Sequence, residues 1–167
     1  VDGVLLDLAT ARQEHYPAPG LNPVVEPGDL EVDLARRDFT VNALALDLPL
    51  ETEGASGVES LSVLDRHGGQ EHLARRELAF LHDGSVSDDP TRVLRAARYG
   101  ARLGFSLAPE ALRQILQTLE AWPWAWRMGD APEDAPPGLA TRMRMELELL
   151  LAREPWREAL QLLHVWG

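Results

Sequence analysis

Residues 87–104 read S-D-D-P-T-R-V-L-R-A-A-R-Y-G-A-R-L-G, and the hydrophobic spacing becomes helical here. The polar residues at 87–89 offer side chains that can cap a helix N-terminus, and Pro90 suits the first turn. Gly104 suits the left-handed position that ends many helices. The spacing therefore predicts a helix that ends near Leu103, preceded by mixed strands and helices and followed by helices alone.

Four arginines fall on one side of this predicted helix, within roughly 120° at about 100° per residue: Arg92, Arg95, Arg98 and Arg102. Arginines stacked in this way repel one another unless an anion or acidic side chains face them. Asp89 and Arg92 are close enough in sequence to hold each other in fixed orientations. Such a pair presents acceptors and donors in one plane, as reading the Watson–Crick edge of a base requires. The alternative is a solvated arginine face with acidic partners.

A second polar cluster reads R-R-D-F-T-V-N-A at residues 36–43. Arg36, Arg37, Asp38 and Asn42 lie within seven residues beside an apolar segment. Because unpaired charge is costly to bury, the arginines need partners, which a triphosphate and a ribose would supply. The alternative is a structural network in which Asp38 pairs one arginine and Asn42 caps a turn.

Further strands, helices and loops are predicted before, between and after these two clusters. Strands are predicted at 4–10, 60–65 and 78–81, and either a strand or a strand–helix junction is predicted at 39–48. The strand at 4–10 is expected to be buried on both faces, which makes the carboxylate of Asp7 unusual. Helices are predicted at 29–37, 70–76, 109–122, 138–152 and 155–165, and loops at 17–28, 54–57 and 122–137. The tryptophans are predicted to anchor helix packing, while Trp124 and Trp126 could also stack on bases.

The composition narrows the possible classes of protein. A chain of 167 residues is long enough for one ordinary domain or two small ones. The absence of cysteine excludes disulfides, thiolate zinc sites and cysteine nucleophiles, and fits a cytoplasmic protein. No apolar run approaches the length of a membrane span. The net charge of -11 argues against nucleic-acid binding by bulk charge, but all 16 Lys and Arg residues are arginines, which suit phosphates and base edges.

Taken in order, these segments resemble the motifs of class II tRNA nucleotidyltransferases and bacterial poly(A) polymerases. Residues 36–43 resemble the R-R-D-x-x-x-N-A motif, and residues 88–92 resemble the [ED]-D-x-x-R motif. Residues 64–69 resemble the D-x-x-G hinge motif, and residues 141–150 are similar to a later helix that stabilises the neck. The ordered set covers nearly the whole chain.

The resemblance implies an α+β fold class. It comprises the C-terminal part of a nucleotidyltransferase (DNA polymerase beta-like) head, with a five-stranded mixed sheet, followed by an all-helical neck. Residues 1–84 would form a partial head, or palm, domain, and residues 85–167 a helical neck that recognises the nucleotide and binds RNA. The implied partners are the 3′ end of tRNA and CTP and/or ATP, with no membrane. The implied cofactor is Mg²⁺, because two metal ions can stabilise the attacking and leaving oxygens together.

The resemblance also implies roles for particular residues. One motif binds the ribose and phosphates, a carboxylate and an arginine hydrogen-bond the base, and two further arginines help to bind the nucleotide. The predicted nucleotide-binding residues match these roles as follows. The ribose and phosphate motif corresponds to Arg36, Arg37, Asp38 and Asn42, the base-binding pair to Asp89 and Arg92, and the two further arginines to Arg95 and Arg98. Asp7 matches an additional strand carboxylate, for which the family implies a catalytic, metal-binding role.

The chain departs from the family pattern at the metal site. Neither the G-G-x-x-R-D loop nor the D-x-D pair occurs in residues 1–167, and Asp7 alone cannot hold two magnesium ions. We therefore expect a fragment that lacks the D-x-D pair and is inactive by itself, although the parent protein is active. An alternative from another class is a non-catalytic helical module that binds RNA or protein.

The activity within the family is open to four possibilities: CCA addition, CC addition, A addition or poly(A) synthesis. The segment at 13–33 lies where these activities differ in the family, through a flexible element. Its sequence, Y-P-A-P-G-L-N-P from Tyr16, is stiffened by proline. This favours a specialised CC-adding or A-adding enzyme.

Overall fold

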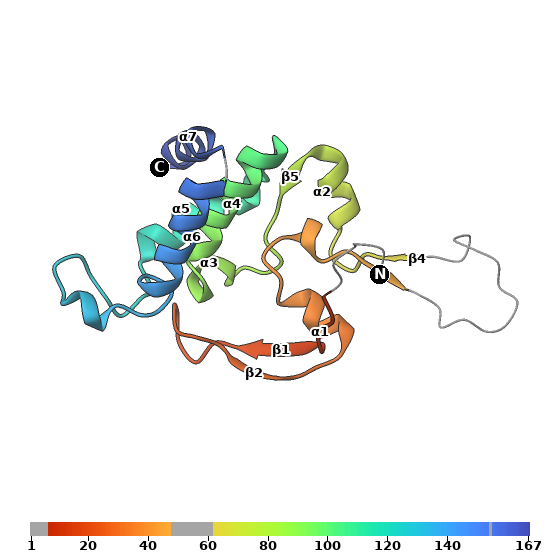
Figure 1. The fold of residues 1–167 in the computed structure, drawn as a ribbon, viewed down its shortest axis with the longest axis horizontal. Coiled ribbons are helices and arrows are strands. Elements are labelled where there is room, and N and C mark those ends of the chain that lie inside the picture. Colours follow the sequence, from red (N-terminus) through yellow and green to blue (C-terminus); the bar gives the residue numbers. More distant parts are fainter. Residues whose placement is uncertain (1–6, 48–61, 154) are drawn as a thin grey trace, which may run out of the picture.

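The structure is a computed structural model that describes residues 7–47, 62–153 and 155–167. The first part contains β1 Arg12–His15, β2 Val24–Pro27, α1 Leu30–Ala35, the 3₁₀ helix η1 Thr40–Asn42, β3 Ala45–Asp47, β4 Ser62–Leu64, α2 Gly69–Arg75 and β5 Glu77–Leu78. The second part contains α3 Ser85–Asp88, α4 Thr91–Leu103, β6 Ser106–Leu107, α5 Pro109–Ala121, the 3₁₀ helix η3 Pro132–Asp134, α6 Thr141–Arg153 and α7 Trp156–Trp166. Figure 1 shows the longer helices clustered together, with the strands and short helices beside and below them. The first part thus mixes helices and strands, as predicted, whereas β6 lies in the part that was predicted to contain helices alone.

Within residues 7–47, 62–153 and 155–167, the strands form three separate two-stranded sheets. β1 pairs with β2 and β3 with β4, both antiparallel, while β5 pairs with β6 in parallel. No sheet in the described ranges has more than two strands, so these residues do not form the five-stranded sheet that the resemblance implies. Each strand has only two to four residues and offers few backbone groups for a third strand to pair with.

The prediction of a buried strand at 4–10 is wrong for residues 7–10, the part of it that the structure describes. Residues 7–10 form no strand and are exposed, with Leu8 98% exposed. Residues 1–6 lie outside the described part of the chain, as does the predicted loop at 54–57. The apolar pattern signalled burial, but no packed surface among the described residues covers residues 7–10.

The β1–β2 hairpin replaces part of the loop that was predicted at 17–28. Its register places Arg12 opposite Pro27 and His15 opposite Val24. Gly28 allows the chain to return beside β1, because a Cβ there would stand 2.9 Å from the backbone nitrogen of Gln13. The prolines predicted a loop. The strand β2 was missed because its partner, β1, lies outside the segment at 17–28.

The helices follow the prediction closely. α4 ends at Leu103 as expected, and Gly104 takes the left-handed conformation with φ of 66°. Its start differs, because Pro90 occupies the N-cap and the preceding residues form the separate short helix α3. The predicted helices α1, α2, α5, α6 and α7 are all present with shifted ends. None of the helices in the described residues is both long enough and apolar enough to span a membrane.

The larger hydrophobic cluster of the described residues joins the two parts of the chain. Its fully buried members come from the segment before α3 and from α4, α6 and α7: Phe39, Leu78, Ala96, Ala97, Leu150 and Ala159. The ring of Phe39 stacks on Phe80 at 5.5 Å and meets Tyr99 edge-on at 5.7 Å. The β5–β6 pairing also crosses the boundary predicted at residues 84 and 85, with Glu77 opposite Ser106. The division into two domains therefore stays a prediction.

Gly69 allows α2 to pack against η1. A Cβ at Gly69 would stand 2.3 Å from the carbonyl oxygen of Thr40, and this backbone atom cannot move aside without disturbing η1. We expect Gly69→Ala to lower the free energy of unfolding by about 2 kcal/mol, measured by urea denaturation. The control is Gly104→Ala, where a Cβ meets nothing within 4 Å and left-handed strain alone costs about 1 kcal/mol. Equal losses in the two variants would contradict the packing role.

Candidate nucleotide-binding site

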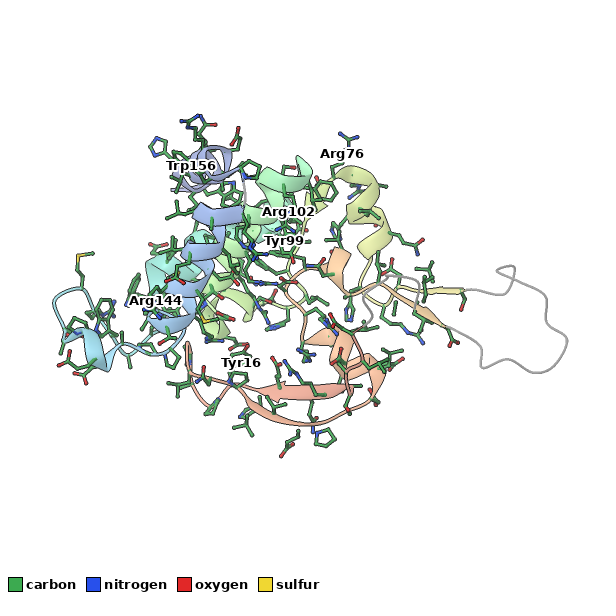
Figure 2. All side chains as sticks on the ribbon, viewed as in Figure 1. Tyr16, Arg76, Tyr99, Arg102, Arg144 and Trp156 are labelled. Carbon is green, nitrogen blue, oxygen red and sulfur yellow. The ribbon has the colours of Figure 1, made fainter. Side chains whose placement is uncertain are left out.

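A pocket of about 700 Å³ lies between the α1–η1 segment, the β1–β2 hairpin, α4 and α6. Seven of the nine predicted site residues line it: Arg36, Arg37, Asp38, Asn42, Asp89, Arg92 and Arg95. Tyr16 and Tyr99 line it too, and Figure 2 shows Tyr99 in the middle of the molecule with Tyr16 below it. The fold thus brings together two clusters that lie far apart in the sequence.

Acidic side chains on α1 and β1 pair the arginines of the cluster at 36–43. Asp33 accepts hydrogen bonds from Nη2 of Arg36 at 2.6 Å and from Nη2 of Arg37 at 2.5 Å. Glu14 on β1 accepts a third from Nη1 of Arg36 at 2.9 Å. The structural-network alternative predicted an internal partner, but that partner is Asp33 and not Asp38.

The Asp33 carboxylate gives the fold a pH dependence. Burial alone would raise the pKa of Asp33, but hydrogen bonds from Arg37 and Arg36 outweigh it and lower the pKa from 3.8 to about 2. Because the folded pKa lies below the unfolded one, this stabilisation is present above about pH 4 and is lost as the pH falls towards 2. We expect the free energy of unfolding to drop by about 1 kcal/mol over this window on account of Asp33, after allowance for solvent screening.

Urea denaturation at a series of pH values, carried out in parallel on the wild-type chain and on Asp33→Asn, measures this contribution. The amide cannot titrate, so the variant should lack the Asp33 part of the acid-side loss. The same slope in both proteins would show that the loss comes from other carboxylates.

Asp38 instead faces the arginines of α4. Its Oδ2 accepts from Nε of Arg95 at 2.9 Å and from Nη2 at 2.6 Å, while Oδ1 accepts from Nδ2 of Asn42 at 2.9 Å. Glu146 on α6 accepts from Nη1 of Arg95 at 3.0 Å and lies 2.9 Å from Nε of Arg98. Burial opposes the charge on Arg95, but Asp38 and Glu146 together raise its pKa above the ordinary value.

These contacts decide between the two interpretations of the arginine row. Acidic partners are present, as the alternative proposed. Arg92 is only 4% exposed and Arg98 only 7% exposed, however, so this part of the row is not a solvated face, whereas Arg102 at its end is exposed. Arg98 lies outside the pocket lining and contacts Glu146, which does line it.

Asp89 and Arg92 are held by other residues and not by each other's side chains. Oδ1 of Asp89 accepts from the backbone N–H of Thr91 at 3.1 Å and from its hydroxyl at 2.6 Å, and Oδ2 accepts from Arg142 at 3.1 Å. Nη2 of Arg92 donates to the carbonyl oxygen of Arg36 at 3.0 Å. The expected mutual pairing is therefore wrong, but both side chains are fixed at the same pocket.

Two charged residues of α6 that line the pocket were missed as site residues. Arg142 reaches Asp89 and also donates to the carbonyl oxygens of Gly20 at 3.2 Å and Leu21 at 3.0 Å. Glu146 lies four residues later on the same helix face. The spacing could have grouped Arg142 with Glu146, but no local signal says which element that face meets.

Asp7 lies apart from this pocket. It is exposed and does not line the cavity. In the part of the chain that the structure describes, no group of three or more His, Asp and Glu side chains is arranged to hold a metal ion. These residues therefore do not fit a magnesium pair, and the catalytic and metal-binding role of Asp7 stays a prediction.

Comparison with known proteins supplies the context for this pocket. Residues 2–79 match the poly A polymerase head domain family. Over 166 residues, or 99% of the chain, it is 45% identical to the CC-adding tRNA nucleotidyltransferase of Deinococcus radiodurans. The chain belongs to the tRNA nucleotidyltransferase and poly(A) polymerase family. It spans 38% of the length of that relative.

Solved structures of tRNA nucleotidyltransferases share the fold. A CCA-adding enzyme in its apo form aligns over 95% of this chain and 33% of its own, with a TM-score of 0.73 and 29% identity. A tRNA nucleotidyltransferase complexed with a primer tRNA and an incoming ATP analog aligns over 86% of this chain and 36% of its own, with a TM-score of 0.65 and 32% identity. The similarity to these members of the family extends across both parts of the chain.

Proposed function

We propose that this chain supplies the nucleotide-selecting half of an enzyme that adds C, A or both to the 3′ end of tRNA from CTP and/or ATP. One observation carries the proposal: a single pocket gathers the cluster at Arg36 and the pair Asp89 and Arg92. The names of the relatives support it, because one adds CC to tRNA and another binds a primer tRNA with an ATP analog.

The proposed roles follow from the chemistry of each side chain. Arg37 is 44% exposed at the pocket, so an incoming phosphate can reach it. The Asp38–Asn42 pair offers an acceptor and a donor of the kind that a ribose hydroxyl needs. Asp89 and Arg92 would read the base edge, and Arg95 would add positive charge at the pocket. Arg98, outside the lining, would contribute through Glu146, which it contacts. A fixed donor and acceptor pair of this kind discriminates between bases by about 1–3 kcal/mol.

The metal-dependent step lies outside what these residues can perform. The resemblance implies Mg²⁺, which would neutralise charge on the triphosphate when bound. The described residues form no cluster that could hold it, so we derive no transfer step from them. We propose instead that the 167-residue chain, assayed by itself, selects and binds a nucleotide without transferring it.

The proposed roles divide between the two predicted domains. Residues 1–84 would act as the partial head, with the phosphate-binding arginines, and residues 85–167 as the helical neck, with the base-reading pair. Their shared core and the β5–β6 pairing would hold the two halves of the pocket in a fixed relative position. The cytoplasmic location expected for such an enzyme stays a prediction.

The β1–β2 connection favours a specialised activity. Gly20 donates to the carbonyl oxygen of Asp88 at 3.2 Å, and its own carbonyl oxygen accepts from the backbone N–H of Gly138 at 2.8 Å. A Cβ at Gly20 would stand 2.9 Å from Cδ1 of Trp124, so the indole lies directly against this turn. A segment tied down in this way supports CC or A addition over full CCA addition, and the identity to a CC-adding enzyme favours CC addition.

The test is nucleotide incorporation by the full-length gene product with Mg²⁺, CTP and ATP. The substrates are tRNA that lacks its 3′ CCA and tRNA that already ends in CC, and the products are read by sequencing tRNA ends. The proposal expects two C residues on the first substrate and none on the second. Addition of A to the second substrate alone would identify an A-adding enzyme, and long A tails a poly(A) polymerase. No incorporation with either substrate would overturn the proposal in favour of a non-catalytic module.

A further inference from the structure

A histidine outside the proposed mechanism contacts the base-reading arginine. Nε2 of His82, just before α3, lies 3.4 Å from Nη1 of Arg92. The guanidinium stays protonated and can only donate, so Nε2 must be the acceptor. The contact therefore requires a neutral imidazole whose proton is on Nδ1.

The rest of His82 is anchored, so the ring is presented from a fixed backbone. Its carbonyl oxygen accepts from the backbone N–H of Ser85 at 3.1 Å and from Nε2 of Gln114 at 2.9 Å. The ring lines a second cavity of about 500 Å³, which Arg92 lines as well. Arg92 thus lies between the nucleotide pocket and the cavity that contains His82.

We propose that His82 is a positioning residue for Arg92: it accepts a hydrogen bond from Nη1 while the carbonyl oxygen of Arg36 accepts one from Nη2. Two acceptors fix the plane of the guanidinium, whereas one acceptor leaves it free to tilt. This inference rests on the proposed role of Arg92 in reading the base, and it names the residue that sets the orientation of that side chain.

The surroundings of His82 make the contact sensitive to pH. Asp88 lies 4.0 Å from Nε2 of His82, and Asp83 is its neighbour in the chain. The other titratable or charged residues that line the cavity are Glu14, His15, Tyr16 and Arg36. The side chain of His82 is 42% exposed, and its partial burial and the charge of Arg92 lower its pKa below the ordinary value of 6.5, although Asp88 and Asp83 oppose this. The ring is therefore neutral near pH 7, and it protonates, ceases to accept and repels Arg92 as the pH falls.

Two substitutions separate positioning from a merely structural role. His82→Gln keeps an acceptor and carries no charge at any pH, and His82→Leu keeps the bulk without an acceptor. In the full-length gene product we expect His82→Leu to raise KM for CTP about fivefold with kcat nearly unchanged, and His82→Gln to retain most of the wild-type value. KM for the wild-type protein should rise as the pH falls from about 7.5 to about 5.5, and KM for His82→Gln should rise less.

His164→Gln is the matched control, because this histidine is exposed at the end of α7 and does not line the pocket. The proposal is overturned if His82→Leu leaves KM unchanged, or if the pH profiles of wild type and His82→Gln coincide.

Imidazole NMR on the 167-residue chain keeps this test separate from that of the proposed function. We expect Nε2 of His82 to be unprotonated at neutral pH, and its pKa to rise in Arg92→Gln because a repelling charge is removed. A proton on Nε2, or an unchanged titration, would overturn the contact. A protein that incorporates no nucleotide but shows the expected titration would refute the proposed function alone.

Discussion

Asp38→Ala is expected to destabilise the chain by about 3 kcal/mol and to abolish nucleotide binding in the pocket. Asp38 is almost completely buried and accepts two hydrogen bonds from Arg95 and one from Asn42. Removing it leaves the arginine with Glu146 as its remaining acidic partner. Breaking one side of such a pair is costly because the other charge stays desolvated. Urea denaturation measures the first effect, and calorimetric titration with CTP measures the second.

The control for Asp38→Ala is Glu148→Ala on the surface of α6. Glu148 pairs with Arg144 at 3.6 Å, and both side chains are mostly exposed. Exposed pairs contribute less than about 1 kcal/mol, so we expect an almost unchanged unfolding midpoint. If the two variants were equally stable, Asp38 would not be the centre of the network.

Arg92→Ala is expected to reduce discrimination between CTP and ATP in the full-length gene product by at least about tenfold. The guanidinium is fixed by the carbonyl oxygen of Arg36 and by His82, and the methyl group of alanine can donate to neither base. The measurement is the ratio of kcat/KM for CTP to that for ATP on the same tRNA.

Since Arg92 is buried, a matched Arg92→Lys variant shows whether charge alone suffices. Lysine keeps the charge but lacks the planar fork, so selection should remain impaired while the fold survives in circular dichroism. Arg144→Ala, at an exposed position on α6, should keep the wild-type ratio. Wild-type discrimination in Arg92→Ala would remove the base-reading role.

Local signals in the sequence sufficed to predict most of the helices and to select seven residues that line the pocket. Pro90 and Gly104 delimit α4: Gly104 takes the left-handed position that was predicted, while Pro90 stands at the N-cap, just before the predicted first turn. Four residues of the cluster at 36–43 line one pocket together with Asp89 and Arg92, and the nucleotide-binding role that the resemblance implies for them stays a prediction. Cap chemistry and helical spacing operate within a few residues, so they can be read without knowing the fold.

What the sequence did not predict depends on contacts between distant residues. Asp33 and Glu14 neutralise Arg36 from α1 and β1, and Arg142 reaches Asp89 from a helix that lies 53 residues further along the chain. The β1–β2 and β5–β6 pairings are likewise set by partners that short strands do not specify. The apolar residues before Thr10 predicted a buried strand, but residues 7–10 are exposed. Burial needs a covering surface as well as an apolar side chain, and a local pattern does not show whether that surface exists.

The decisive experiment is a titration of CTP and ATP into the 167-residue chain labelled with ¹⁵N at arginine, followed by NMR of the side-chain Nε–H groups. The pocket predicts that the signals of Arg36, Arg92 and Arg95 shift together and saturate with one Kd, while exposed Arg66, paired with Glu31, stays unmoved. The absence of a saturable shift, or shifts confined to arginines outside the pocket, would contradict the assignment of this site to the nucleotide.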